Sequence, residues 1–142
     1  MSWKAQMGFL LSAAAEPTMA PVRLGDRVID AAMACTPREW GRGLQGHDLD
    51  RVSAMLFVMP DGSHLPFHVA GLRRELLLAF FNAQGHLLEL VCLNENYTVH
   101  RPFKAYAYVL EMVEPDLSIG LIQDLTAGLD VTSLPRLDGS PR

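Results

Sequence analysis

The sequence predicts an α+β fold, a compact and mainly antiparallel β domain that is barrel-like or sandwich-like and carries one short capped helix. Short apolar runs recur along the chain and are bounded by Gly, Pro, Asn and Asp, which is the pattern of strands joined by turns. One segment combines a capping box with a proline at the first helical position, which indicates a helix. The 142 residues, 49% of them hydrophobic, suffice to bury one core.

The first expected element is a β-hairpin in VRLGDRVIDAAMAC, which follows the Pro-containing segment from Glu16 to Pro21. Two apolar runs flank Gly25-Asp26, and this dipeptide favours a tight turn between strands. The second strand is expected from Val28 to Ala34.

A short helix is expected next, in TPREWGRGLQG. Thr36 suits the N-cap, Pro37 suits the first helical position, and Glu39 is the partner that completes a capping box. Gly43 and Gly46 limit this helix to two or three turns.

Three apolar runs then predict the middle of a sheet. SAMLFVMP is expected to form a central strand that ends at Pro60, before the turn residues Asp61-Gly62-Ser63. ELLLAFFN and HLLELVCL are expected to be adjacent antiparallel strands, joined by a tight turn around Ala83 to Gly85.

The run KAYAYVLEMV alternates with a period of two residues, which predicts a strand packed on both sides. Its larger side chains are expected on one face, namely Tyr106, Tyr108, Leu110 and Met112. The other face is expected to hold Ala105, Ala107, Val109 and Glu111. The following segment, PDLSIGLIQDLTAGLDV, is expected to contain a short helical turn and a last strand.

Charge and composition narrow the expected partners. Twelve basic and sixteen acidic residues give a formal charge of −4, and no Lys/Arg cluster forms the stripe that binding to successive phosphates needs. Nucleic acid is therefore not expected as a partner. No run approaches the roughly 20 apolar residues of a membrane span, so none is expected.

The Cys and His residues form no pattern that is typical of a catalytic, metal-binding or disulfide site. Cys35 and Cys92 each lie in an apolar run, which favours small buried hydrophobes over a disulfide framework. No Cys/His grouping has zinc-finger spacing, and no His-x-x-x-His pattern falls on the expected helix. We therefore predict no catalytic set, metal site or cofactor.

The chain is expected to divide into three parts. Residues 1–20 form an N-terminal arm or a weak imitation of a signal peptide, 21–132 form a single globular domain, and 133–142 form a C-terminal tail. Cleavage after the Ala-rich stretch, near Ala15, is left open. The apolar side chains of the arm, Trp3, Phe9, Leu10 and Leu11, are predicted interface residues, because an exposed segment so apolar needs something to pack on.

Taken in order, VIDAAMACTPREWGRGLQG, AMLFVMP, FNAQGHLLEL and YVLEMV resemble the bacterial and phage family called domain of unknown function 192. The likeness extends from about Val22 to Val131 and rests on matches that are mostly structural. These are Thr36-Pro37, Gly43-Leu44, Met55-Leu56-Phe57, Gly85 and Val109-Leu110-Glu111.

The resemblance places the family's polar segment, Phe-Trp-Met-Lys-Asn-Thr followed by Pro-Leu-Asp, within Leu65 to Gly85. Counting back from Gly85 sets Phe67 on the family's Phe and His68 on its Trp. The family's Lys, Asn, Thr and Asp then correspond to Ala70, Gly71, Leu72 and Leu77. Because Ala and Leu supply neither charge nor an exchangeable proton, the polar set is degenerate here.

Loss of that polar set favours a non-enzymatic role. The leading hypothesis is an interaction or structural protein that joins a larger assembly through its tails. Its partners in that assembly would be copies of itself or a capsid shell. A phage virion accessory or capsid cement protein is the form that the family's phage members suggest. The alternative is an exported small-molecule binding protein or minor enzyme, with a candidate pocket formed by Met55, Phe67, His68 and Glu111. Localisation is left open between the virion, if the protein is phage-encoded, and an exported, periplasmic or cytoplasmic place.

Overall fold

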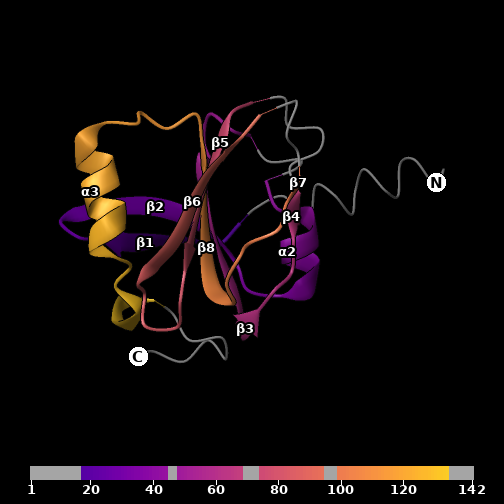
Figure 1. The fold of residues 1–142 in the computed structure, drawn as a ribbon. Helices are drawn as coiled ribbons and strands as arrows, with labels where there is room; N and C mark the ends of the chain where they lie inside the picture. The colour runs from indigo at the N-terminus through magenta and orange to yellow at the C-terminus, as the bar shows by residue number, and fades with distance from the viewer. Residues whose placement is uncertain (1–16, 45–47, 69–73, 95–98, 135–142) are drawn as a thin grey trace, which may run out of the picture.

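In a computed structural model of the protein, residues 17–44, 48–68, 74–94 and 99–134 are described. Their main element is a six-stranded sheet with the order β1-β2-β3-β8-β5-β6 (Figure 1). Its strands are β1 (Met19–Leu24), β2 (Arg27–Ala34), β3 (Ala54–Ser63), β5 (Leu76–Phe81), β6 (Leu87–Leu93) and β8 (Tyr106–Val113). A second, two-stranded sheet consists of β4 (Phe67–His68) and β7 (Val99–His100).

The main sheet is mixed, with one parallel pair. β2 and β3 run parallel, whereas the pairs β1–β2, β3–β8, β5–β8 and β5–β6 are antiparallel. Two parallel strands need a crossover connection, and the helix α2 (Pro37–Arg42) lies in it. Within the described residues β1 and β6 do not pair with each other, so the sheet is open. The predicted α+β class is confirmed.

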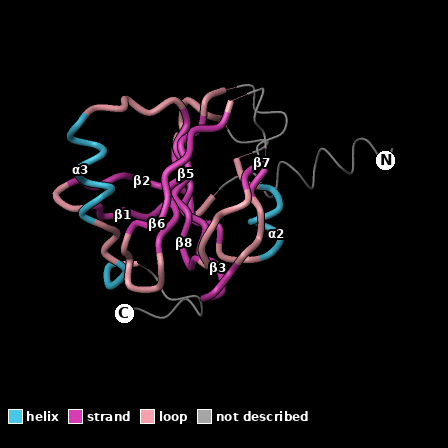
Figure 2. Tube along the Cα trace, in the orientation of Figure 1, coloured by secondary structure: helices cyan, strands magenta, loops and turns pink. Residues whose placement is uncertain are grey.

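The helices α2 and α3 lie on opposite sides of the main sheet, as Figure 2 shows by colour. On one side, the α3-side cluster packs β-strand residues such as Leu56, Phe81 and Leu110 against Leu121 and Leu125 of the helix α3 (Ile119–Ala127). The other side is covered by α2 and the β4–β7 pair. Its α2-side cluster includes Leu44, Phe57, Phe67, Leu78 and Phe80.

Both predicted β-hairpins are confirmed. Leu24 and Arg27 flank the first turn, where Gly25 has φ +55°, a left-handed conformation that glycine adopts without strain. β5 and β6 are joined by a turn in which the side chain of Asn82 accepts hydrogen bonds from the backbone N–H groups of Gln84 and His86. Local turn chemistry therefore sets both hairpins.

The end of one strand differs from the prediction. β3 does not end at Pro60 but continues to Ser63, with a register shift against β8 between Val58 and Ser63. Proline fits at this place because such an irregularity interrupts the ladder of hydrogen bonds.

The segment after β8 forms the nine-residue helix α3, not a short helical turn, and Ser118 caps its N-terminus. The expected last strand is reduced to an isolated bridge between Leu24 and Leu129. A short 3-10 helix, η1 (Val131–Ser133), follows it.

Three side chains lie elsewhere than expected. Four side chains of β8 were expected on one face. Tyr108, Leu110 and Met112 do share a face and contact the α3-side cluster, but Tyr106 packs in the α2-side cluster on the other side. The difference arises where β3 and β8 shift register. Cys92 is exposed on β6 and Cys35 is half-buried, so neither is the fully buried side chain that was expected; both are free thiols.

In the described ranges, no helix is long and apolar enough to cross a membrane. The division into arm, domain and tail stays a prediction, since residues 1–16 and 135–142 lie outside the described residues. β1 begins at Met19, and Leu134 is buried.

Candidate functional site

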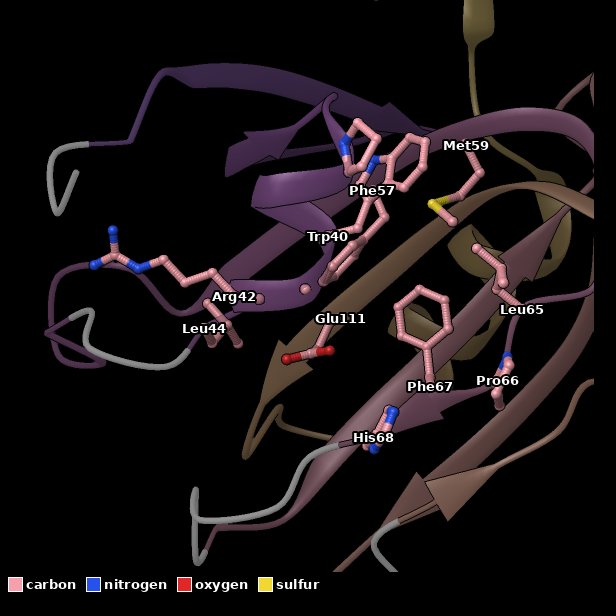
Figure 3. A pocket seen from close by; sticks show the side chains of 13 residues that line it. Trp40, Arg42, Leu44, Phe57, Met59, Leu65, Pro66, Phe67, His68 and Glu111 are labelled. Carbon is pink, nitrogen blue, oxygen red and sulfur yellow. The ribbon is translucent and has the colours of Figure 1, made fainter. Parts of the chain in front are cut away.

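A cavity of about 570 Å³ lies beside α2, on the side of the main sheet that carries the β4–β7 pair. Figure 3 shows its walls: α2 on one side, β4 and the segment before it on the other, and Glu111 of β8 between them. Most of the lining side chains are apolar, namely Pro37, Trp40, Leu44, Phe57, Met59, Leu65, Pro66 and Phe67. Among the described lining residues, Arg42, His68 and Glu111 carry titratable groups.

The wall made by α2 is fixed at both ends of the helix. Thr36 Oγ1 accepts a hydrogen bond from the backbone N–H of Glu39, and the Glu39 carboxylate accepts one from the backbone N–H of Thr36 at 3.1 Å. This is the predicted capping box, and it is confirmed. At the other end, Gly43 ends the helix with φ +56°. A helix of six residues gains little from its own hydrogen bonds, so these caps and its packing hold it.

Trp40 joins α2 to the sheet. Its indole Nε1–H points to two backbone carbonyl oxygens, that of Ala34 at 3.0 Å and that of Val58 at 3.1 Å. These carbonyls belong to β2 and β3, the parallel pair that the crossover connects. The indole therefore lines the cavity in a fixed position.

Phe67 forms the opposite wall. Its ring makes a T-shaped contact with Phe57, with ring centroids 4.8 Å apart, and also contacts Phe80 and Tyr106. The segment before it is held by the Tyr106 hydroxyl, which donates to the carbonyl oxygen of Leu65 at 2.6 Å. His68 follows Phe67 on β4 and is exposed to solvent.

Glu111 is the buried acid of the cavity. It lies in the middle of β8, opposite Met55 of β3 and Leu78 of β5, and only 2% of its surface is exposed. Its carboxyl group makes no hydrogen bond or ion pair with another described residue, and desolvation by burial raises its pKa to about 8. The group is therefore mostly protonated and uncharged near pH 7.

Three of the four predicted pocket residues meet at this cavity. Phe67, His68 and Glu111 line it, whereas Met55 is buried in the α2-side cluster and is not among the lining residues. Met55 is opposite Glu111 in the β3–β8 register, so it supports the strand that carries the acid. The predicted interface residues Trp3, Phe9, Leu10 and Leu11 lie outside the described residues.

Sequence reasoning missed the aromatic wall. The sequence pattern predicts Trp40 only as part of the expected helix, and Phe57 only as a strand residue. The available signal was an aromatic residue one turn after the cap of a helix too short to bury it alone. Of the positions aligned with the family's polar segment, Leu77 is buried in the α3-side cluster, and residues 70–72 lie outside the described residues.

In the part of the chain that the structure describes, no group of three or more His, Cys, Asp or Glu side chains could hold a metal ion. The described lining offers a ligand apolar contact, aromatic rings, one buried carboxyl group and the side chains of Arg42 and His68.

Comparison with solved structures shows that other proteins have a similar fold. Two crystal structures are similar, each with 18% sequence identity. A protein of unknown function from Novosphingobium aromaticivorans superimposes with a TM-score of 0.60, and the alignment covers 82% of this chain and 92% of that protein. A Sinorhizobium meliloti protein provisionally described as a transcription regulator superimposes with a TM-score of 0.55, and the alignment covers 70% of this chain and 83% of that protein. At such identity, these likenesses show the fold alone. No curated protein matches the chain.

The family profile of domain of unknown function 192, described as "Uncharacterized ACR", matches residues 20–118. That range contains α2, the β4–β7 pair and Glu111, and so all the described walls of the cavity. The chain belongs to the domain of unknown function 192 family.

Proposed function

We propose that this protein binds a small, largely apolar molecule in the cavity between α2 and β4. The observation that carries the proposal is an apolar cavity of about 570 Å³ with a carboxyl group on its wall that has no partner among the described residues. Cavities of this size, lined by apolar and aromatic side chains with few polar groups, are the usual form of small-molecule sites.

The rigid surroundings of the cavity support the proposal. α2 is held by its capping box and by the indole of Trp40, and the segment opposite is held by the Tyr106 hydroxyl. A site whose walls are already in place loses less conformational entropy on binding. Nothing in this arrangement requires a reaction, so binding without turnover is the simplest function.

Trp40 offers a direct test. The chain has two tryptophans, and Trp3→Phe leaves Trp40 as the single indole reporter. Addition of a panel of small amphipathic compounds to this variant is expected to change the Trp40 fluorescence. Those compounds are also expected to raise the melting temperature with concentration, as one-site binding requires.

Two matched substitutions locate the site. Leu65 and Ile122 are both partly exposed aliphatic side chains, 52% and 38% exposed, so truncation of either costs little stability. Leu65→Ala, at the cavity, is expected to weaken binding severalfold, and Ile122→Ala, on α3, is expected to leave binding unchanged. Equal effects of both, or no response to any compound of the panel, would contradict the proposal.

A second candidate function, an interaction protein, is supported by exposed apolar side chains on and before α3. Leu117 and Ile119 are exposed, and together with Ile122 they line an open groove. Patches of this kind often mark contact surfaces. The virion accessory and capsid cement roles stay predictions.

Native mass of the full-length protein and of a variant lacking residues 1–16 tests the assembly role. The deletion must stop there because β1 begins at Met19. Loss of a large complex in a variant that remains folded would support assembly through the arm. An unchanged number of subunits in the complex would contradict it.

A further inference from the structure

The buried carboxyl group of Glu111 limits what the cavity can hold. The group is almost fully buried, faces the cavity, and has no hydrogen-bond partner among the described residues (Figure 3). Buried polar groups in proteins are nearly always paired, because an unpaired one loses its interactions with water without replacement. The missing partner is therefore expected on the ligand.

The charges around Glu111 disfavour an anionic ligand. Once Glu111 ionises, which its pKa of about 8 allows at mildly alkaline pH, its carboxylate would repel an anion in the cavity. Arg42 also lines the cavity, but its guanidinium group extends away from Glu111 in Figure 3 and has other interactions. His68 is exposed at the rim. Two ligand classes remain: a cation that pairs with the carboxylate, and a neutral molecule that accepts a hydrogen bond from the protonated acid.

The aromatic side chains favour the cation. Trp40, Phe57 and Phe67 all line the same cavity as Glu111. The π-system of an aromatic ring attracts cations, tryptophan most strongly, and aromatic side chains beside a carboxylate are a recurring way to hold alkylammonium groups. A neutral hydrogen-bond acceptor would gain from Glu111 but would gain nothing specific from three aromatic neighbours.

We propose that the ligand is an organic cation, an ammonium group on a small apolar body, held by the Glu111 carboxylate and by the aromatic side chains of Trp40, Phe57 and Phe67. This inference rests on the proposed function, because it names the ligand class of the same cavity. Binding then requires the ionised form of Glu111, so the ligand displaces the proton that burial keeps on the carboxyl group.

A pair of probes of equal shape separates charge from apolar fit. Choline carries a quaternary ammonium group that does not titrate, and 3,3-dimethylbutan-1-ol is its uncharged carbon analogue. Affinities are measured by ligand-observed NMR of the methyl signal, with the full-length protein at pH 6 and at pH 9. Choline is expected to bind at least tenfold more tightly than the alcohol at pH 9. Its affinity is expected to rise by up to about 100-fold from pH 6 to pH 9, as Glu111 ionises, while that of the alcohol stays level.

Two isosteric variants complete the experiment. Glu111→Gln is expected to abolish the preference for choline and its pH dependence while retaining the binding of the alcohol. Glu75→Gln removes an exposed acid outside the cavity and is expected to leave both affinities unchanged. Equal loss of choline binding in both variants would reduce the effect to overall charge and overturn the inference.

The remaining outcomes separate this inference from the proposed function. If the alcohol binds and choline does not, the cavity is a binding site but not for cations. If the affinity of the alcohol falls as the pH passes 8, Glu111 donates a hydrogen bond to neutral ligands, and the inference is again overturned. If neither probe binds at either pH and the amphipathic panel also fails, the proposed function itself is wrong.

Discussion

His100 Nε2 lies 2.9 Å from Glu89 Oε2, and this contact joins the β4–β7 pair to β6 of the main sheet. Both side chains are largely buried, at 8% and 17% exposure, and the His100 ring also contacts Phe80. β7 pairs with β4, which carries Phe67 and His68 at the cavity. The contact therefore holds the outer wall of the cavity from behind.

A double-mutant cycle on this pair is expected to show strong coupling. Glu89→Ala and His100→Ala each remove a partner from a partly buried contact, and the coupling energy in urea unfolding is expected to be about 0.5–3 kcal/mol. The exposed pair between Arg74 and Glu114 is the control, and its coupling should be smaller because water screens it. Purely additive effects of the Glu89 and His100 substitutions would contradict the expected role.

Glu111 is expected to make stability fall as the pH rises. Its pKa is about 8 in the folded protein, above the usual value of 4.5, so between these two values the folded state binds more protons than the unfolded state. The free energy of unfolding therefore decreases from about pH 5 to pH 8 and levels off above, by at most ~5 kcal/mol for a shift of this size.

Urea unfolding of the protein and of Glu111→Gln between pH 5 and pH 9 measures this effect. The amide does not ionise, so the variant should have the flatter profile and should become the more stable of the two at alkaline pH. Parallel profiles would mean that Glu111 titrates like an ordinary carboxyl group.

Gly85→Ala is expected to destabilise the fold by more than about 2 kcal/mol. Gly85 has φ +87°, and a Cβ atom there would overlap the carbonyl oxygen of Leu129. Its own carbonyl oxygen accepts a hydrogen bond from the backbone N–H of Leu129 at 2.8 Å, so the two backbones cannot separate freely.

Gly41→Ala is the matched control for this substitution. Gly41 lies within α2, and a Cβ atom there meets nothing within 4 Å. Alanine favours the helix over glycine, so a gain of about 0.5–1 kcal/mol is expected. Thermal unfolding of both variants measures the contrast, and similar losses in the two would contradict it.

Trp40→Phe is expected to cost about 1–3 kcal/mol, because the phenyl ring keeps much of the packing but donates to neither Ala34 nor Val58. The same substitution should weaken ligand binding in the cavity, since the wall formed by α2 loses its attachment to β2 and β3. Unchanged stability in urea would show that the two hydrogen bonds contribute nothing net.

Local chemistry made much of the fold predictable. Thr36, Pro37 and Glu39 specify the start of α2 within four residues, and the hairpins depend on the turns at Gly25 and Gly85. α3 was underestimated because Gly120 and Thr126 weaken its helical pattern. Its Ser118 cap and the buried pair Leu121 and Leu125, one turn apart, were the signals that favoured a full helix.

The candidate site was less predictable, because its walls come from distant parts of the chain. Phe67, His68 and Glu111 were reached through a family resemblance and the alternation of β8. The contribution of Trp40 depends on the parallel pairing of β2 with β3, which no single segment specifies. The cavity itself arises where the α2 crossover and β4 leave a space unfilled, and such a space has no signature in residue order.

The order of the main sheet has a consequence for synthesis of the chain. β8 is the last strand among the described residues, yet it lies between β3 and β5. The sheet is therefore split into two halves, β1–β3 and β5–β6, until residues 106–113 have left the ribosome. Before that moment both inner strands, β3 and β5, present unpaired backbone groups and apolar side chains. We therefore expect nascent chains that stall before β8 to be prone to aggregation, because completion of one central strand closes both inner edges in a single step.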